Sequence, residues 1–449
     1  MSYAATAARS HRSVIAGGLG LLFAAGALGA FALMLSLLLY RYPPSPLIVA
    51  GFAFGLLGAL ALALLSPDLA VATGVFLLAA VRFEPAPTDL VFAVLITVGV
   101  TTGRVDFSRF PPSAALLTGA FLTLNLVSAV DVPDPARAAA FFSITFYVAV
   151  FGLWLASYVT SARVARGVAR AYIASAVASA LLSTLALLLP IPGHDLFTRI
   201  GRAEGLFKDP NVFGPFLVPA ALILMEEILV PRLLSARRST KLAAFLVLTL
   251  GVLFSYSRAA WLNLGIGVLV VLAILALRRG GGRQAARAFA VVLAAAAAIT
   301  AAVAFTGSVT FLEQRARIQT YDATRFGAQS ESIHWAERYP FGIGPGQFER
   351  YAGISVHSTY ARALAEEGLP GFLVIVALML ATFASAGRNA MAGRDTYGIG
   401  SAALLGAWCG ILVNSIFVDT LHWRHLWAVA ALIWAGSCRP TRDLPRTSD

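Results

Sequence analysis

The sequence is poor in charge and in cysteine. Asp, Glu, Lys and Arg make up 12% of its 449 residues, whereas hydrophobic residues make up 59%. This excludes an ordinary soluble protein, and repeated apolar runs of about twenty residues are typical of membrane-spanning helices. The two cysteines, Cys409 and Cys438, fall in successive apolar runs at different predicted membrane depths, so neither a disulfide nor a thiolate metal site is predicted.

The apolar runs predict an all-α fold, a polytopic transmembrane helical bundle of about 14 spans. The first run follows a basic N-terminus, as in a signal peptide, but it is too long for a signal-peptide core, so we expect an uncleaved first span. The predicted spans are 14–40, 47–65, 67–82, 88–103, 113–130, 138–160, 168–190, 211–230, 242–257, 259–277, 286–306, 366–386, 397–418 and 423–437.

Basic residues set the predicted orientation. If the N-terminus is cytoplasmic, the loops 161–170, 231–241, 278–287 and 387–395 and the C-terminal tail are cytoplasmic too, and all of them contain Arg. Cytoplasmic loops of membrane proteins carry an excess of Lys and Arg. The net charge of +12 is therefore explained by topology, and a nucleic-acid partner is not predicted.

Three segments on the predicted outer side contain basic residues, although the excess of Lys and Arg is expected on the cytoplasmic side. They are 191–210, the turn at Arg258, and 307–365. Positive charge kept where membrane insertion disfavours it indicates an anionic ligand. The third segment is also the longest polar interruption, and it must lie outside the lipid because charge in hydrocarbon is costly. These outward basic residues are Arg199, Arg202, Lys208, Arg258, Arg315, Arg317, Arg325, Arg338, Arg350 and Arg362.

The chain is predicted to have four parts. Residues 1–190 form an N-terminal transmembrane scaffold, and residues 191–306 a transmembrane part with outward-facing arginines. Residues 307–365 form one large extracytoplasmic loop, and residues 366–449 a C-terminal transmembrane part with a cytoplasmic tail.

The stretch GRAEGLFKDPNVFG contains a helix start, with Asp209 as N-cap and Pro210 at the first helical position. This structural role is sufficient to explain Asp209 and Asn211. The helix N-terminus also points its positive end outward, next to Arg202 and Lys208, and such an end favours phosphate. Arg202 and Lys208 are therefore candidate binding residues, with Asp209 and Asn211 in support.

Arg258 stands at the tip of a tight turn in FSYSRAAWLNLG. A single arginine near Trp261 is also typical of an interfacial membrane anchor, and that alternative stays open. Together with Arg202 on the same predicted side, however, Arg258 could bracket a diphosphate with bidentate hydrogen bonds.

His357 precedes a predicted helix that leads into the next span. A neutral imidazole there could accept a proton from a sugar hydroxyl, although a hydrogen-bonded surface histidine is the structural alternative, and His334 is a weaker candidate. Arg362 and Glu366 are four residues apart and predict an ion pair, so Glu366 is assigned a structural role in orienting the loop.

The glycine-rich run at 342–346 is assigned a structural role. Gly342, Gly344 and Gly346 lack the strand, helix and Lys-Ser pair of a nucleotide-binding loop and predict a turn.

Asp419, His422 and His425 have metal-like spacing, but a third nitrogen or sulfur ligand is missing. Trp423 and Trp427 favour an interfacial aromatic belt at this turn instead. No metal and no cofactor is therefore predicted.

Taken in order, GRAEGLFKDPN, SRAAW, PFGIGPGQF and HSTYARALAEEGLPG resemble motifs of the O-antigen ligase and O-antigen polymerase superfamily of bacterial membrane glycosyltransferases. The resemblance runs from the eighth predicted span onward. The first seven spans match only as hydrophobic helices.

This resemblance implies a GT-C-like fold and a metal-independent, inverting transfer of a glycan from undecaprenyl diphosphate, at the periplasmic face of the inner membrane. Arg202 and Arg258 match the arginines that hold the donor diphosphate, and His357 matches the histidine that activates the acceptor hydroxyl. Tyr360 lies in the same motif as a supporting residue. Ser358 stands where the family commonly has Asn, which bears on acceptor positioning.

The acceptor is left open. A polymerase of O-antigen or exopolysaccharide joins glycans to one another, whereas a ligase of lipopolysaccharide assembly transfers the glycan to lipid A-core. A transporter or flippase of lipid-linked glycans is the alternative from another class. The predicted spans offer little ionisable chemistry at mid-membrane depth and no visible inverted repeat, which disfavours transport.

Overall fold

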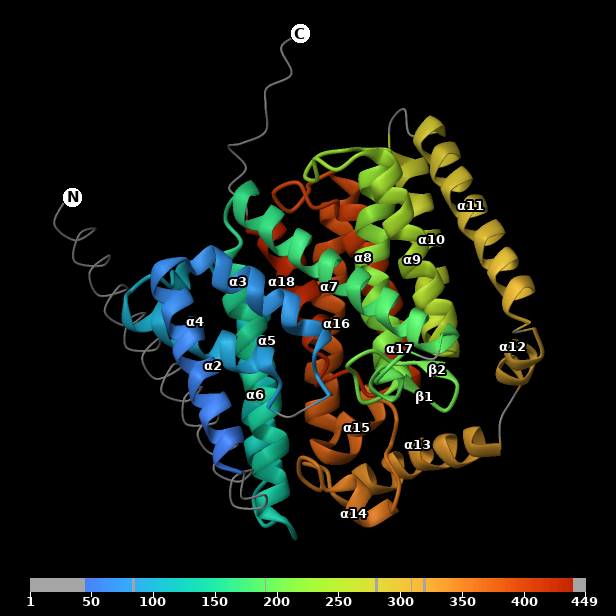
Figure 1. The fold of residues 1–449 in the computed structure, drawn as a ribbon. Coiled ribbons are helices and arrows are strands. Elements are labelled where there is room, and N and C mark those ends of the chain that lie inside the picture. The colour runs from blue at the N-terminus through green and yellow to red at the C-terminus, as the bar shows by residue number, and fades with distance from the viewer. Residues whose placement is uncertain are drawn as a thin grey trace, which may run out of the picture.

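The computed structural model describes residues 45–82, 85–189, 191–278, 282–307, 309–317 and 320–438. They are mainly helical (Figure 1), with one short antiparallel hairpin formed by β1 Thr198–Arg199 and β2 Arg202–Ala203. The predicted all-α class is confirmed for this part of the chain. The predicted first span, 14–40, and the end of the C-terminal tail lie outside the described residues.

Prolines begin the N-terminal helices. Proline has its φ fixed near the helical value and lacks an N–H that would be unpaired in the first turn, so it favours the start of a helix. Each of the helices α2 to α6 starts at such a proline. The elements of this part are α2 Pro46–Leu65, α3 Pro67–Phe76, η1 Leu77–Ala79, α4 Pro87–Thr101, η2 Phe107–Arg109, α5 Pro112–Ser128, α6 Pro135–Tyr158 and α7 Ala162–Leu188.

The C-terminal helices are organised around α8, whose side chains are almost all buried and which packs against α7, α9, α10 and α17 (Figure 1). Because α8 is held from several sides, its N-terminal end is a rigid support for nearby loops. The elements of this part are η3 His194–Leu196, α8 Pro210–Leu229, α9 Arg238–Phe254, α10 Arg258–Leu277, α11 Gly282–Thr306, α16 Gly368–Met391, α17 Ser401–Phe417 and α18 Arg424–Ser437.

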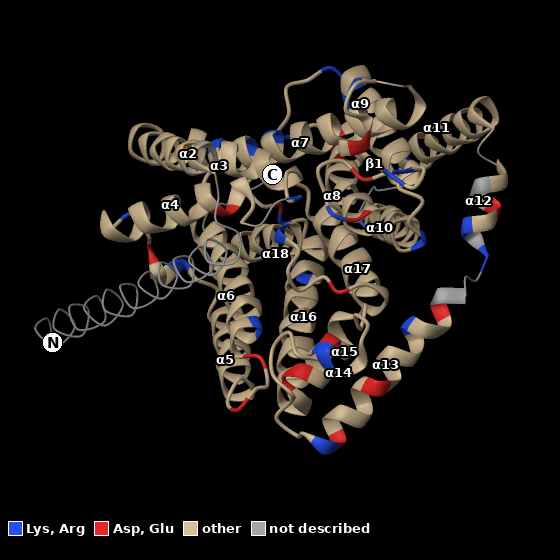
Figure 2. Cartoon of the chain, turned by 60° about the horizontal axis from the view of Figure 1, so that its bottom comes forward, with Lys and Arg blue, Asp and Glu red and all other residues tan. Residues whose placement is uncertain are grey.

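Six helices in the described ranges are long and apolar enough to cross a membrane, namely α6, α7, α8, α10, α11 and α16. Every predicted span within those ranges coincides with a helix, although several of these helices are shorter. Figure 2 shows many of the charged residues near helix ends and along α12 and α13. The protein is thus an all-α polytopic membrane protein, and the number of crossings stays a prediction.

The predicted basic loop at 161–170 is helical instead. Ser161 accepts a hydrogen bond from the backbone N–H of Val164 at 3.3 Å and so caps α7, which begins at Ala162. Arg166 then donates to the carbonyl of Leu233 at 3.0 Å, and Arg170 to Ser235 at 3.0 Å. These arginines extend from the first turns of α7 and hold the connection between α8 and α9.

The polar segment 307–365 is also mainly helical in its described residues. Figure 1 shows α13, α14 and α15 gathered at one end of the bundle, beyond the ends of α16 and α17. The predicted polar interruption is therefore a folded layer on one end of the molecule. Its helices are α12 Val309–Ala316, α13 Thr320–Arg338, α14 Phe348–Ala352 and α15 Thr359–Glu366.

Two glycine turns join this layer to α16. Gly342 has φ 89° and Gly368 has φ 69°, values that favour glycine. A Cβ atom on Gly342 would collide with the carbonyl oxygen of Glu366, and one on Gly368 with that of Pro340. The predicted turn at Gly342 is confirmed, and each of the two turns closes against the other.

Candidate functional site

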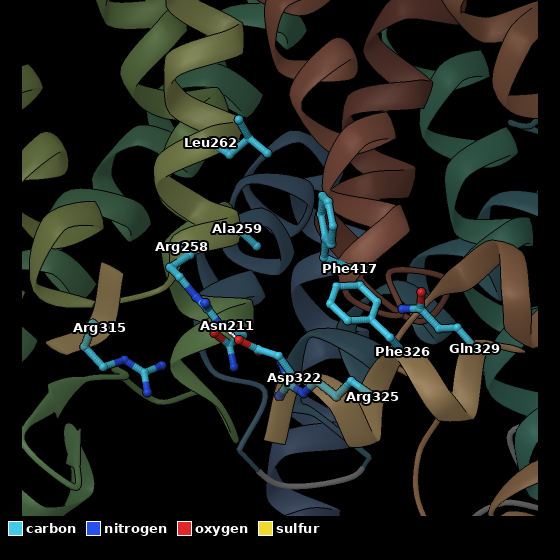
Figure 3. Close-up of a pocket in the computed structure, with 10 residues that line it drawn as sticks. All are labelled: Asn211, Arg258, Ala259, Leu262, Arg315, Asp322, Arg325, Phe326, Gln329 and Phe417. Atoms are coloured by element: carbon cyan, nitrogen blue, oxygen red, sulfur yellow. Dashed lines mark hydrogen bonds and ion pairs between the residues drawn. The ribbon is translucent and has the colours of Figure 1, made fainter. Parts of the chain in front are cut away.

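Arg258 lies at the edge of a cavity of about 380 Å³ at the same end of the bundle (Figure 3). It is the first residue of α10, and Ser257 caps this helix by accepting from the N–H of Ala260 at 3.3 Å. Its guanidinium donates to both carboxylate oxygens of Asp322, at 2.6 and 2.9 Å. The cavity is lined by Asn211, Arg258, Ala259, Leu262, Arg315, Asp322, Arg325, Phe326, Gln329 and Phe417.

Arg202 reaches this cavity through a neighbour. Its Nε donates to the carbonyl of Ser255 at 2.9 Å, and its Nη2 donates to the side-chain oxygen of Asn211 at 3.1 Å. Asn211 lines the cavity, and its backbone N–H donates to Asp209 at 2.8 Å, which confirms Asp209 as the N-cap of α8. The start of α8 therefore joins Arg202, through Asn211, to the lining of the cavity that contains Arg258.

Positive charge dominates the cavity lining. Arg258, Arg315 and Arg325 line it together with Asp322 as the only acidic residue among the described lining. A low-dielectric recess with this excess of guanidinium groups favours an anion with several oxygens, such as a phosphate or diphosphate. The sequence places the arginines on the outer side, but Asp322 has no motif around it that would have identified it as the partner of Arg258.

Lys208 is not part of this cavity. Its side chain is exposed and lines a second, smaller cavity, which Val212 in the first turn of α8 also lines.

His357 lies close to the cavity without lining it. Burial lowers the pKa of its half-buried imidazole, and the positive charge of Arg325 lowers it further, against smaller opposing effects of Asp209 and Asp419. Its carbonyl accepts a long hydrogen bond, 3.4 Å, from Gln329, which lines the cavity. A lowered pKa favours the neutral imidazole, the form that can accept a proton.

The backbone of His357 has φ 48°, a left-handed conformation that is unfavourable for a residue with a Cβ atom. The next residues hold it in place. Ser358 caps α15 by accepting from the N–H of Ala361 at 3.3 Å, and Thr359 contacts Thr420 through their hydroxyls at 2.9 Å. Tyr360 donates to the carbonyl of Leu412 at 3.1 Å, so it ties α15 to α17.

Arg362 is the centre of a buried ion network. Its predicted pair with Glu366 is confirmed at 2.7 Å, and it also contacts Glu349 at 2.5 Å and Asp419 at 2.6 Å. Glu366 in turn accepts from the backbone N–H groups of Gly346 at 2.7 Å and Phe348 at 3.2 Å. The network joins the glycine turn, α14, α15 and the turn before α18, and Glu366 has the predicted structural contacts.

Replacing Arg362 by Met should destabilise the protein strongly, because it leaves buried carboxylates without their counter-ion. Breaking such a buried pair costs about 3–5 kcal/mol. We expect a lower melting temperature for Arg362→Met when monodisperse protein in detergent is followed by size exclusion after heating. Arg350→Ala, which changes an exposed arginine in α14, is the matched control and should melt like the parent. Equal melting of Arg362→Met and the parent would contradict this role.

Asp419, His422 and His425 have separate partners. Asp419 pairs with Arg362, His422 contacts the hydroxyl of Thr145 at 2.9 Å, and His425 stacks on Trp423 with ring centroids 4.9 Å apart. Within the described ranges, no group of three His, Cys, Asp or Glu side chains could hold a metal ion.

Residues 243–376 match the protein-family model described as O-antigen ligase. This confirms the predicted resemblance to the O-antigen ligase and polymerase superfamily. No curated protein matches the chain. The matched region contains Arg258, Asp322 and His357, whereas Arg202 and Lys208 precede it.

Proposed function

From the O-antigen ligase match of residues 243–376, we propose that this membrane protein transfers a glycan from undecaprenyl diphosphate to a sugar hydroxyl. The family match supports a role in bacterial surface polysaccharide assembly. The proposal includes the finer points inferred from sequence: a GT-C-like bundle of about 14 spans, the four-part division of the chain, cytoplasmic termini, and a site on the periplasmic side of the inner membrane.

The observation that carries the proposal is the arginine-rich cavity beside a half-buried histidine. Arg258 lines the cavity, and Arg202 is joined to its lining through Asn211. Guanidinium groups bind diphosphate oxygens with paired hydrogen bonds. Asp322 holds Arg258 by two hydrogen bonds and so limits the number of orientations that its guanidinium adopts before the donor binds.

In the proposed reaction the acceptor hydroxyl oxygen attacks the anomeric carbon of the donor sugar from the face opposite the diphosphate. The bond between that carbon and the diphosphate oxygen breaks, the diphosphate leaves with the electron pair, and the configuration inverts. His357 accepts the proton of the attacking hydroxyl. The diphosphate gains charge as it leaves, so Arg202 and Arg258 stabilise the transition state more than the bound donor.

The pH dependence follows from the lowered pKa of His357. A general base works in its deprotonated form, so the rate falls as the pH drops through its pKa, and a lowered pKa moves this fall to lower pH. Arg325→Gln removes a positive charge that lowers this pKa and should move the fall in kcat to higher pH. The measurement is kcat against pH at saturating donor.

Arg338→Gln is the control for that experiment, because Arg338 is exposed at the far end of α13. Its pH profile should match the parent. Identical profiles for Arg325→Gln and the parent would argue against His357 as the titrating base.

The direct test is transfer by purified protein in detergent with EDTA present. The donor is an undecaprenyl-diphosphate glycan, supplied either alone or with lipid A-core. A ladder of products from donor alone identifies a polymerase, and one shifted product that requires lipid A-core identifies a ligase. Loss of transfer with EDTA would contradict the metal-independent mechanism, and movement of intact donor across vesicles without transfer would favour a flippase.

A further inference from the structure

A second cavity, of about 120 Å³, opens at the same end of the bundle. It is bounded by the segment that follows α3, the start of α8 and the start of α18 with its preceding turn, and Val81, Lys208, Val212 and His425 are among its lining residues. The α8 N-terminal turn separates it from the arginine-rich cavity, because Asn211 of that turn lines the first cavity. The two cavities therefore flank one turn.

His425, which lines this second cavity, has a ring nitrogen without a hydrogen-bond partner among the described residues. Its side chain is 3% exposed, and the nitrogen is Nε2. The ring is fixed by Trp423, which stacks on it, and by Phe216, which meets it edge-on at 5.7 Å between centroids. Burying an imidazole nitrogen without a partner is unfavourable, and packing alone does not account for it. A ligand hydroxyl would supply the missing hydrogen bond.

Two basic side chains also line the cavity, the exposed Lys208 before α8 and Arg424 at the start of α18. Arg424 forms two hydrogen bonds to Asp89, at 2.7 and 2.5 Å, and Asp89 is buried. This pairing balances its charge. Val81, Val212 and Trp423 add apolar surface. Apolar walls with a few hydrogen-bonding side chains, among them Lys208 and His425, match a sugar, which presents C–H groups on its faces and hydroxyls at its edge.

The location suits the sugar that receives the glycan. Thr359, two residues after His357, contacts the hydroxyl of Thr420 at 2.9 Å, in the turn before α18. His422 and Trp423 follow in the same turn and line the second cavity. The His357 segment is thus joined to the first cavity through Gln329 and to the second through the turn before α18, and a general base has to lie near the hydroxyl that it deprotonates.

We propose that the second cavity holds the terminal sugar of the acceptor, with a sugar hydroxyl hydrogen-bonded to Nε2 of His425. This inference rests on the proposed transferase function and adds the acceptor subsite to it. The small volume fits one sugar unit, while the rest of the acceptor extends outside.

The test compares two variants that alter the second cavity with one that alters the first. His425→Phe keeps a ring but removes the nitrogen, and Val212→Phe fills the space. Leu262→Phe makes the matched change in the arginine-rich cavity. The acceptor probes are lipid A-core and an alkyl glycoside of the donor repeat unit, which has no diphosphate and cannot act as donor.

His425→Phe and Val212→Phe should raise the KM for the acceptor about fivefold to tenfold, as expected for a lost hydrogen bond or a blocked pocket, with the donor KM unchanged. Leu262→Phe should raise the donor KM instead. Val212 is only half-buried, so its variant tests the site even if His425→Phe does not fold.

Two results overturn the inference in different ways. If the parent transfers glycan and the folded variants keep its acceptor KM, the cavity assignment alone is wrong. If the parent transfers to neither probe, the transferase proposal is wrong and the acceptor subsite is wrong with it.

Discussion

His357→Ala should lower the transfer rate at least about a hundredfold, the usual contribution of a general base, while the donor still binds. The lowered pKa of the half-buried imidazole favours its neutral form, and the residue lies close to the cavity without lining it, so its loss removes proton transfer more than donor contacts. Single-turnover transfer and equilibrium binding of labelled undecaprenyl-diphosphate glycan measure the two effects separately.

His334→Ala is the matched control, since His334 is an exposed histidine of the same polar segment. It should keep the rate of the parent. His357 also occupies a strained backbone position, so His357→Gln is a second variant that keeps a hydrogen-bonding side chain of similar size but cannot act as a base at neutral pH. Transfer at the parental rate by either His357 variant would exclude general-base catalysis by this residue.

Arg258→Ala should weaken donor binding about tenfold to a hundredfold, the range expected when charge-assisted hydrogen bonds to a phosphate are lost. Arg202→Ala should act in the same direction. Because both side chains are proposed to contact one diphosphate, the double variant should lose less than the sum of the two free-energy changes. Binding of labelled donor in detergent measures all three.

Removing Arg258 also deprives Asp322, in the cavity proposed for the diphosphate, of its bonds to this guanidinium, and repulsion between Asp322 and the donor would add to the loss. The variant with both Arg258→Ala and Asp322→Asn separates the two causes. If it binds donor like the parent, repulsion by Asp322 explains the effect and Arg258 is not a diphosphate ligand. Arg350→Ala, which changes an exposed arginine of the same segment, should leave binding unchanged.

The positions of the helices were predictable because each apolar run is local in sequence. Every predicted span in the described ranges coincides with a helix, and Asp209 caps α8 as its neighbour Pro210 indicates. Less local features were missed. The predicted span began at residue 168 and left Arg166 in a loop, whereas the N-cap at Ser161 starts α7 at Ala162.

The site was predictable only in part. Arg202, Arg258 and His357 belong to recognisable motifs, and the structure brings them to one end of the bundle. Their partners come from distant parts of the chain. Asp322 pairs with Arg258 across 64 positions, and Asp89 pairs with Arg424 across 335. No spacing rule for one helix or one turn connects such residues, so these contacts require the tertiary structure.

The pair of closed turns at Gly342 and Gly368 has a consequence for biosynthesis. The chain leaves the ribosome from its N-terminus, so the segment with His357 is made before Gly368. Until that later turn exists, the turn at Gly342 lacks its contacts with Ala365, Glu366 and Gly368, and the segment is held only by contacts such as that of Gln347 with Asp134. We therefore expect the site to form only after the start of α16 has been synthesised, so that a nascent protein already inserted in the membrane is inactive until the chain has been made beyond Gly368.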